Sequence, residues 1–445
     1  MIMPQDTIKL QSGMYIHEHP SWPKFRWDSD KIIVLLEAVG RLQGLLFGRL
    51  SNLGLEDKLQ AMADNMTRDV VYSSEIEGIQ LNADEVRSSI ARRLGIDSMK
   101  DLATSSHYVD AVVAVSIDAC EHTKDQLTDE KLFGWQSAFF PTGFSQGASI
   151  EVGKYRTHEE HIVSGLMDRE KVHYVAPSPE RVPSEMKQFL DWFNSDSGLP
   201  YAVASAIAHF WFVSIHPFED GNGRLSRILG DVLLARGDNS ALRFYNMSSE
   251  INRDKKHYYD ILERTQHGDG DITEWLAWYL QTLKTALEDS NRIVSRTLNK
   301  SMFWQRVAGV PMTERQTKTL NLFLDGYESK ITTKQWATLN KCSVDTAGRD
   351  IQDLLTKGIL TMEIPGAKRP SYAIRYRGAA ELPADLVENA KIEHNEVSDN
   401  YYLISSLNGS PVKEWVLPLD AERLLRNDTT IEILIDKYCA YLIAE

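Results

Sequence analysis

The chain has 445 residues, with 63 Asp and Glu against 49 Lys and Arg, which gives a formal net charge of −14. This excess of negative charge argues against a protein built along its whole length to coat nucleic acid or an anionic membrane. A hydrophobic content of 42% excludes disorder as the dominant state. The length fits about two to four domains.

The cysteines and the N-terminus indicate the compartment. Cys120, Cys342 and Cys439 are far apart and lack the paired spacing of a disulfide framework or a zinc site. The first residues, MIMPQDTIKL, lack the charged region and apolar core of a secretory signal, and no apolar run of roughly eighteen residues occurs. We therefore expect a protein of the reducing cytoplasm that makes no contact with a membrane.

Helical patterns dominate the first 125 residues. Apolar residues recur at every third or fourth position from 29 to 50, behind Asp28 or Ser29 as the cap, which predicts an amphipathic helix. Similar periodicity predicts further helices over residues 56–77, 82–94 and 102–123.

The pattern changes between residues 143 and 183. Short β-branched runs alternate with Gly and Pro in GASIEVGKYRT, HIVSG and KVHYVAPSP, which indicates a small hairpin and not a sheet-based domain. Helical patterns then resume over residues 183–194, 200–213, 223–236 and 254–287.

The composition shifts again near residue 300. The stretch from 314 to 360 predicts three short helices, and LTMEIPGAKRPSYAIRY then predicts a strand, a turn and a strand. This is the element order of a winged helix-turn-helix. Residues 301–376 hold 11 Lys and Arg against 7 Asp and Glu, whereas residues 377–445 hold 6 against 13. We expect a mildly basic domain followed by a small acidic tail.

The stretch SIHPFEDGNGRLSRILGDVLLARG, residues 214–237, has the residue types of a phosphate-binding site. Gly221 and Gly223 allow a tight turn that opens a helix, and such a turn directs free backbone N–H groups and the positive helix end at an anion. Arg224 and Arg227 lie three positions apart on that helix, so one face can present both guanidinium groups to a polyphosphate.

Two residues ahead of this turn add chemistry. Asp220 can hold a Mg²⁺ ion that is bound to the same phosphates. His216 is a candidate general base, because histidine ordinarily titrates near neutrality. A lone His is usually packed and a lone Gly-Asn-Gly is usually a surface turn. Their joint occurrence with two correctly spaced Arg and an acid favours a functional site.

This segment resembles the signature of the Fic family, HPFx[D/E]GNGRxxR, at all nine fixed positions. The resemblance implies transfer of AMP from ATP to a Tyr, Thr or Ser hydroxyl of a target protein, with His216 as the base and Asp220 as the Mg²⁺ ligand. It also implies that the amides of residues 221–223 and the Asn222 side chain hold the α-phosphate region. Arg224 and Arg227 would hold the β- and γ-phosphates.

A second family feature lies upstream, in VVYSSEIEGIQL. Ser73, Glu77 and Gly78 match the inhibitory motif [S/T]xxxE[G/N]. Glu77 would pair with Arg227 and prevent productive placement of the γ-phosphate. Taken alone, a Ser and a Glu four positions apart form an ordinary solvated helix face. Together with the intact signature, the inhibitory interpretation is favoured.

Looser resemblances suggest where the target and the adenine bind. The hairpin near residues 155–177 resembles a target-docking flap, whose exposed edge at Ile162 and Val163 could align an extended segment by strand addition. A simple connecting hairpin is the alternative. Downstream, Tyr259 and Gln266 would border the adenine, although Tyr258 or Tyr259 could be a core aromatic residue. HEEH, residues 158–161, resembles a metal pair only superficially, because positions i and i+3 of a strand face opposite sides.

These patterns predict a mainly α protein: a helical region with an inhibitory helix at 1–125, a helical Fic core with a hairpin flap at 126–290, a winged helix-turn-helix at 301–376, and a small α+β tail at 377–445. The substrate would be ATP with Mg²⁺, and the partners a target protein with a hydroxyl side chain, which includes the chain itself, and a second copy of the chain in a homodimer. One alternative is a DNA-binding regulator that senses nucleotide through the Fic core. It would contact duplex phosphates weakly through Lys334, Lys341, Arg349, Lys357, Lys368 and Arg369. Another alternative is an enzyme that removes AMP.

Overall fold

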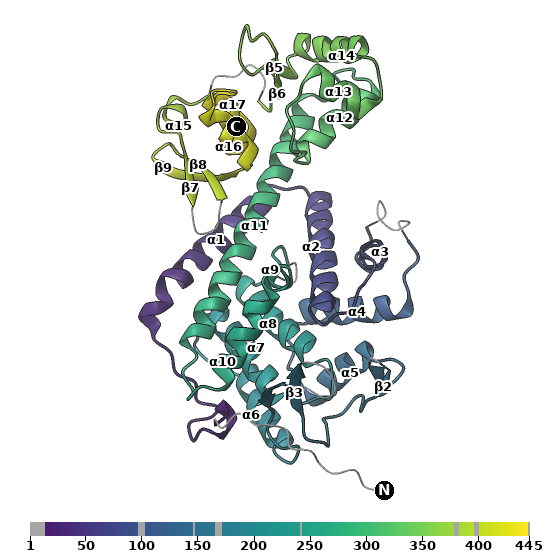
Figure 1. Cartoon of the computed structure of the whole chain (residues 1–445), viewed down its shortest axis with the longest axis vertical. Coiled ribbons are helices and arrows are strands. Elements are labelled where there is room, and N and C mark those ends of the chain that lie inside the picture. The colour runs from purple at the N-terminus through teal and green to yellow at the C-terminus, as the bar shows by residue number, and fades with distance from the viewer. Residues whose placement is uncertain are drawn as a thin grey trace. The chain divides into compact units, whose positions relative to one another are not determined.

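The computed structural model describes residues 14–96, 103–145, 147–164, 171–240, 243–377, 382–395 and 400–443. The described residues of 1–48 and 54–290 form one compact unit, and those of 49–53 and 291–445 form a second. Helices predominate and the strands form only small sheets, which confirms the prediction of a mainly α protein (Figure 1).

The first unit begins with two short 3-10 turns, Ile16–Glu18 and Ser29–Lys31. Its helices are α1 (Ile33–Ser51), α2 (Leu55–Ile76), α3 (Ala83–Leu94), α4 (His107–Glu121), α5 (Asp129–Phe139), α6 (Val182–Asn194), α7 (Tyr201–Ile215), α8 (Asn222–Asp238), α9 (Met247–Arg253), α10 (Lys255–Gln266) and α11 (Thr273–Arg306). The last turn of α1, from Arg49, and the second half of α11, from Asn291, belong to the second unit.

The helices differ from the sequence prediction at three places. Helices α5 and α9 were not predicted, although the Thr128 side chain accepts a hydrogen bond from the Lys131 N–H as an ordinary N-cap of α5. The single helix predicted over 254–287 is two helices. Helix α10 ends at Gln266, and Gly270 in the following turn has a φ of +96°. Asp271 caps the next helix, because its side chain accepts a hydrogen bond from the Thr273 N–H. Helix α11 then continues to Arg306.

The centre of the first unit is the pair α7 and α8. Helix α7 is buried over its whole length from Ala202 to Ile215, as expected of a helix that is apolar on all sides. Helix α8 packs along it. The signature motif begins in the six-residue connection between them, residues 216–221, and continues into the first turns of α8. The motif is therefore held between two buried helices.

The hairpin predicted between residues 143 and 183 is present as two antiparallel pairs. Strand β1 (Phe144–Ser145) pairs with β2 (Ala148–Ser149), and β3 (His161–Ser164) pairs with β4 (Lys171–Val175). Ile162 lies opposite Tyr174 and Val163 opposite Val172, with a register shift between them. Residues 165–170 of the predicted flap lie outside the described residues.

The second unit contains two hydrophobic cores. In the first, α12 (Glu314–Leu324), α13 (Thr333–Asn340) and α14 (Val344–Thr356) enclose Leu320, Trp336 and Leu354, and β5 (Leu360–Met362) pairs with β6 (Tyr372–Ile374). Thr313, Thr332 and Ser343 cap the three helices. Three helices followed by an antiparallel pair is the element order that the sequence predicted for residues 301–376.

The tail forms the second core. Strands β7 (Lys391–Asn395), β8 (Asn400–Leu407) and β9 (Ser410–Val416) make an antiparallel sheet, accompanied by α15 (Ala384–Glu388), α16 (Pro418–Leu425), α17 (Ile431–Cys439) and a 3-10 turn, Ala440–Leu442. Leu403, Val416 and Leu434 lie in its core. Among the helices that the structure describes, none combines the length and the apolarity needed to cross a membrane.

Candidate functional site

His216 is the C-cap of α7 and adopts a left-handed conformation with a φ of +51°. Its Nδ1 lies 3.2 Å from the carbonyl oxygen of Val213. Because a carbonyl oxygen only accepts, Nδ1 carries the hydrogen and Nε2 keeps a free lone pair. Burial, aided by the nearby Arg156 charge, lowers the pKa of His216 to about 4. The ring is therefore neutral at pH 7 and able to take a proton through Nε2.

The loop behind His216 is held by Arg156, which the sequence analysis did not single out. Its buried guanidinium donates to the carbonyl oxygens of His216 at 2.7 Å, His158 at 2.8 Å and Pro177 at 2.5 Å. Its backbone N–H donates to the carbonyl of Pro217 at 2.9 Å. Arg156 thus ties the motif loop to the segments on both sides of the flap.

The Asn222 side chain braces the same loop from the other end. Its Oδ1 accepts from the Phe218 N–H at 3.0 Å, and its Nδ2 donates to the Phe218 carbonyl at 2.7 Å. The side chain predicted to hold a phosphate is therefore engaged with Phe218. Its backbone N–H, like that of Gly223, lies in the first turn of α8, where backbone N–H groups have no partner within the helix.

Glu77 lies against the first turn of α8. A Cβ at residue 223 would overlap the Glu77 carboxylate, so only glycine lets that carboxylate approach the helix terminus so closely. Gly221 has a φ of +93°, which favours glycine at the start of the turn. An internal carboxylate thus occupies the position at a helix N-terminus where anions are stabilised.

Arg227 connects this carboxylate to α2. Its Nη2 donates to Glu77 Oε1 at 2.8 Å and to the Ser73 carbonyl at 2.8 Å, and its Nε donates to Ser73 Oγ at 2.9 Å. The Nη1 atom is buried and has no hydrogen-bond partner among the described residues. Gly78, with a φ of +78°, follows the end of α2. The structure therefore brings Ser73 and Glu77 to the second motif arginine, while Gly78 ends the segment that carries them.

Of the other polar motif residues, Asp220 lies on the loop before α8 and Arg224 lies in the first turn of α8. Asp220 accepts from the Gly221 N–H at 2.5 Å and also from the Ser145 hydroxyl of β1. Arg224 is buried, and its Nη1 donates to the Tyr108 hydroxyl of α4 at 3.0 Å. Neither Ser145 nor Tyr108 has a sequence signature, because each is far from the motif along the chain.

A cavity of about 490 Å³ opens beside these residues, and groups from the predicted base, the inhibitory motif, the start of α8, the flap and the adenine site line it. It is lined by Glu77, Ile162, Val163, His216, Gly223, Tyr259 and Gln266, among others. Tyr258 is 1% exposed and packs in the core, whereas Tyr259 is 40% exposed at the cavity. Gln266 is buried and donates to the Ser214 hydroxyl at 3.2 Å.

The β3–β4 hairpin forms one wall of this cavity, and β3 pairs only with β4 among the described residues. Ile162 packs against Tyr15 and Tyr174, while Val163 is 40% exposed. His173 and Lys171 of β4 bind Glu263 of α10 at 2.6 and 2.9 Å. This polar connection between the hairpin and α10 was not predicted from the sequence.

The two histidines of HEEH do not form a pair. His158 Nδ1 lies 3.3 Å from Glu219, and His161 Nε2 lies 3.9 Å from Glu159. Ligand atoms of Glu151, His158 and Glu219 lie within 4.8 Å of one another. Glu151 already accepts from Lys154 and Thr157, and Glu219 accepts from the Glu151 N–H. This cluster is an ordinary loop network.

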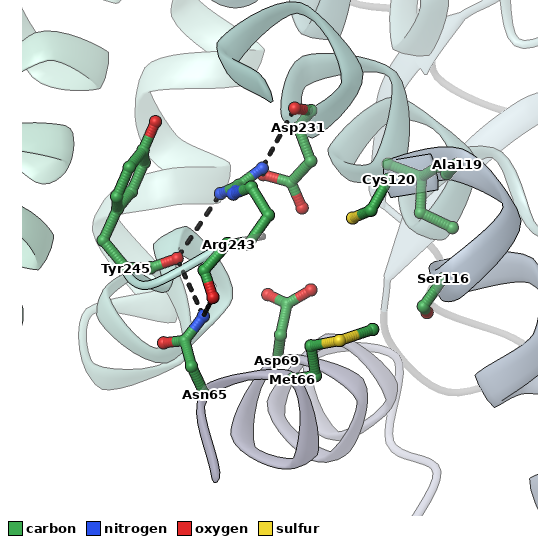
Figure 2. A pocket seen from close by; sticks show the side chains of 10 residues that line it. Asn65, Met66, Asp69, Ser116, Ala119, Cys120, Asp231, Arg243 and Tyr245 are labelled. Atoms are coloured by element: carbon green, nitrogen blue, oxygen red, sulfur yellow. Dashed lines mark hydrogen bonds and ion pairs between the residues drawn. The ribbon is translucent and has the colours of Figure 1, made fainter. Parts of the chain in front are cut away.

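Helix α2, which carries Glu77, is fixed to the unit at its centre. Figure 2 shows Asn65 donating to the carbonyl oxygens of Arg243 and Tyr245, each at 3.2 Å, beside a small cavity. Arg243 in turn pairs with Asp231 of α8 at 2.7 Å. Burial raises the pKa of Asp231 above its ordinary value. These contacts hold α2 and α8 in the register that brings Glu77 to Arg227.

Two segments of the chain match known families. Residues 126–234 match the Fic/DOC family. Residues 15–96 match a domain of unknown function, DUF4172.

Relatives with the same domain share parts of the sequence. The chain is 32% identical over 124 residues to a protein adenylyltransferase Fic of Nematostella vectensis. The matched segment covers 27% of this chain and 25% of that protein. It is 24% identical over 225 residues to a probable protein adenylyltransferase of Aquifex aeolicus. That matched segment covers 50% of this chain and 62% of the relative. The chain thus spans about a quarter of the length of the first of these relatives.

A solved structure of a Fic family protein from Desulfovibrio desulfuricans is 19% identical and covers 79% of this chain and 97% of its own, with a TM-score of 0.47. The family match at 126–234 includes every motif residue from His216 to Arg227. The chain therefore contains a Fic domain.

Proposed function

We propose that this chain transfers AMP from ATP to a hydroxyl side chain of a target protein, with release of pyrophosphate. The observation that carries the proposal is that His216, with a free lone pair on Nε2, lines the same cavity as the N-terminal turn of α8. A base and an anion-binding helix terminus on one cavity are what adenylyl transfer to a hydroxyl requires. The relatives named as protein adenylyltransferases support the same reaction.

In this reaction the target hydroxyl oxygen forms a bond to the α-phosphorus, and the bond from that phosphorus to the oxygen bridging to the β-phosphate breaks. His216 Nε2 takes the hydroxyl proton, and pyrophosphate leaves with the electron pair. The backbone N–H groups of Asn222 and Gly223 bind the α-phosphate region. Arg224 and Arg227 hold the β- and γ-phosphates. These residues act by positioning and charge stabilisation.

The donor set fits a magnesium ion. Asp220 offers a carboxylate oxygen, the hard ligand that Mg²⁺ prefers together with substrate phosphates. The Gly221 N–H and the Ser145 hydroxyl fix the orientation of this carboxylate. When bound, Mg²⁺ neutralises charge on the phosphates.

The remaining cavity residues suit the other parts of the substrates. Tyr259 and Gln266 border the adenine, and the unpaired edge of β3 at Ile162 and Val163 aligns an extended segment of the target by strand addition. Glu77 restrains the reaction, because its carboxylate occupies Arg227 and lies where the α8 terminus would receive phosphate.

The proposal is tested by the position of a label in ATP. Incubated with Mg²⁺, the Glu77→Gly variant should label protein from ATP labelled at the α-phosphorus and not from ATP labelled at the γ-phosphorus. Labelling from the γ-position would indicate phosphoryl transfer and contradict the proposal.

Weak duplex DNA binding by the second unit is a second candidate function, because one group of basic side chains there is exposed. These are Lys334, Lys341, Arg349, Lys368 and Arg369, on α13, on α14, between them and on the β5–β6 turn. Lys357, which was predicted to join them, instead donates to the Pro311 carbonyl at 2.7 Å and to Asp353 at 2.5 Å. The exposed group is suited to contacting phosphates.

A further inference from the structure

Arg224 lies in an aromatic cradle. Its guanidinium carbon lies 4.3 Å from the ring centre of Phe139 and 4.9 Å from that of Phe140, and the residue is 2% exposed. Both rings come from the end of α5, and Phe140 also closes on the motif turn, because a Cβ at residue 221 would lie 3.1 Å from it. The rings hold the guanidinium plane by cation–π contact.

This buried charge has no acidic partner within ion-pair distance among the residues that the structure describes, and its Nε atom has no hydrogen-bond partner there. Arg227, three residues later, is paired with Glu77. A buried cation without a counter-ion costs free energy, so an anion that reaches Arg224 is stabilised. The arrangement therefore favours a polyanionic ligand at this position.

One polar side chain fixes the rotation of the guanidinium within the cradle. The Tyr108 hydroxyl accepts from Arg224 Nη1 at 3.0 Å. Tyr108 lies in the first turn of α4, between the two segments that match known families, 15–96 and 126–234. A phenol is a neutral acceptor, so it orients the guanidinium without neutralising its charge.

We infer that Tyr108 is a positioning residue for the polyphosphate: it fixes Arg224 between Phe139 and Phe140, so that the remaining N–H groups of the guanidinium bind phosphates beyond the α-phosphate. This inference rests on the proposed function. It assigns a role in substrate binding to α4, a helix outside both family matches.

The test compares two ligands in equilibrium binding to the full chain with Mg²⁺. One is α,β-methylene-ATP, which cannot release AMP, and the other is AMP, which lacks the β- and γ-phosphates. Tyr108→Phe removes one hydroxyl and keeps the ring. It should weaken methylene-ATP binding about tenfold, the scale of one hydrogen bond to a charged group, and leave AMP affinity unchanged within about twofold. A general structural role would weaken both ligands.

Three further variants separate the possible outcomes. Arg224→Ala should weaken methylene-ATP binding at least as much as Tyr108→Phe, and adding Tyr108→Phe to Arg224→Ala should cause no further loss. Tyr245→Phe, which removes another buried tyrosine hydroxyl bonded to Asp238 at 2.5 Å, should leave both affinities unchanged.

If Arg224→Ala weakens binding and Tyr108→Phe does not, the role of Tyr108 is refuted while the proposed function stands. If Arg224→Ala has no effect on methylene-ATP binding, the phosphate site in the proposed function is itself refuted. Equal losses for methylene-ATP and AMP in Tyr108→Phe would also overturn the inference.

Discussion

Arg224 and Arg227 are three residues apart on α8 and both are buried, yet the groups that contact their charges differ. Arg227 is neutralised by Glu77, whereas Arg224 is held by aromatic rings and a neutral hydroxyl. His216 resembles Arg224 in this respect, because it too is positioned by a neutral group, the Val213 carbonyl. At the scale of single residues, Arg224 and His216 are thus oriented by neutral groups, whereas Arg227 is paired with a carboxylate.

His216 should be essential for transfer and dispensable for nucleotide binding. His216→Ala should lower AMP transfer about 10²- to 10⁴-fold, the usual contribution of a general base, and leave methylene-ATP affinity nearly unchanged. Rates come from incorporation of α-label and affinities from equilibrium titration. Activity within threefold of the parent, about 0.6 kcal/mol, would contradict the assignment.

The ionisation of His216 can be followed directly. Because burial lowers its pKa from the usual 6.5 to about 4, the ring should stay neutral as the pH falls from 8 to about 5 and take a proton only near pH 4. Histidine-selective NMR of the free protein measures this, with His216→Ala identifying the signal. Titration at or above pH 6.5 would show that the ring is not desolvated.

Asp220 should be needed for its charge. Asp220→Asn keeps the size and an oxygen acceptor for the Gly221 N–H but loses the carboxylate. It should reduce Mg²⁺-dependent transfer about 10²-fold or more, because charge on the departing pyrophosphate is then less well neutralised. Transfer rates measured across a Mg²⁺ titration check this. Full activity of Asp220→Asn would mean that the side chain only caps the turn.

At the scale of elements, the site is built where α2 meets the first turn of α8. Glu77 and Arg227 are 150 positions apart in the sequence. The contacts of Asn65 with the loop before α9 fix α2, the helix that ends beside Glu77. The end of α2 therefore places the Glu77 carboxylate against the N-terminal turn of α8.

Removing the Glu77 carboxylate should activate the enzyme. A charge-assisted pair contributes roughly 1.5 to 3 kcal/mol, and each 1.4 kcal/mol is a factor of ten, so Glu77→Gly should raise AMP transfer about ten- to a hundredfold. Glu75→Gly is the matched control. It places the same substitution two residues earlier on α2, at a side chain bonded to Asn252 and not to Arg227. Equal rates for Glu77→Gly and the parent would exclude inhibition by this pair.

The sequence predicted the elements whose signals are local. The motif turn and α8 follow from glycines and arginines within twelve residues, and α14 follows from its apolar spacing behind Ser343. The break between α10 and α11 was missed although Gly268, Gly270 and Asp271 mark it, because the apolar periodicity on both sides suggested one helix. Helix α5 was missed although Thr128 caps its first turn.

The parts of the site that could not be predicted are contacts between distant segments. Arg156 reaches the motif through backbone carbonyls, Tyr108 through one hydroxyl, and Glu263 through the hairpin. None of these has a characteristic spacing, since any residue type with a suitable donor or acceptor could serve from many positions. The pairing of Glu77 with Arg227 was anticipated only through the family resemblance.

At the scale of the whole molecule, the chain joins a unit that contains the Fic domain to a second unit with an exposed basic group. The full chain should bind duplex DNA weakly, with affinity falling steeply as salt rises. Lys368→Ala with Arg369→Ala should weaken that binding several-fold, about one factor of ten at most for two phosphate contacts at moderate salt.

Lys357→Ala should leave DNA binding unchanged, because Lys357 is occupied by Asp353 and Pro311. Fluorescence anisotropy with a random duplex at several salt concentrations measures the three proteins. No binding at low salt, or equal binding by all three, would exclude this surface as a DNA contact.

The most direct test of AMP transfer is the intact mass of the full chain after incubation with ATP and Mg²⁺. The Glu77→Gly variant should gain the mass of one or more AMP groups, and Glu77→Gly with His216→Ala should gain none, because the base that accepts the hydroxyl proton is then absent. No AMP adduct on Glu77→Gly, or the same adduct on both variants, would contradict adenylyl transfer by this site.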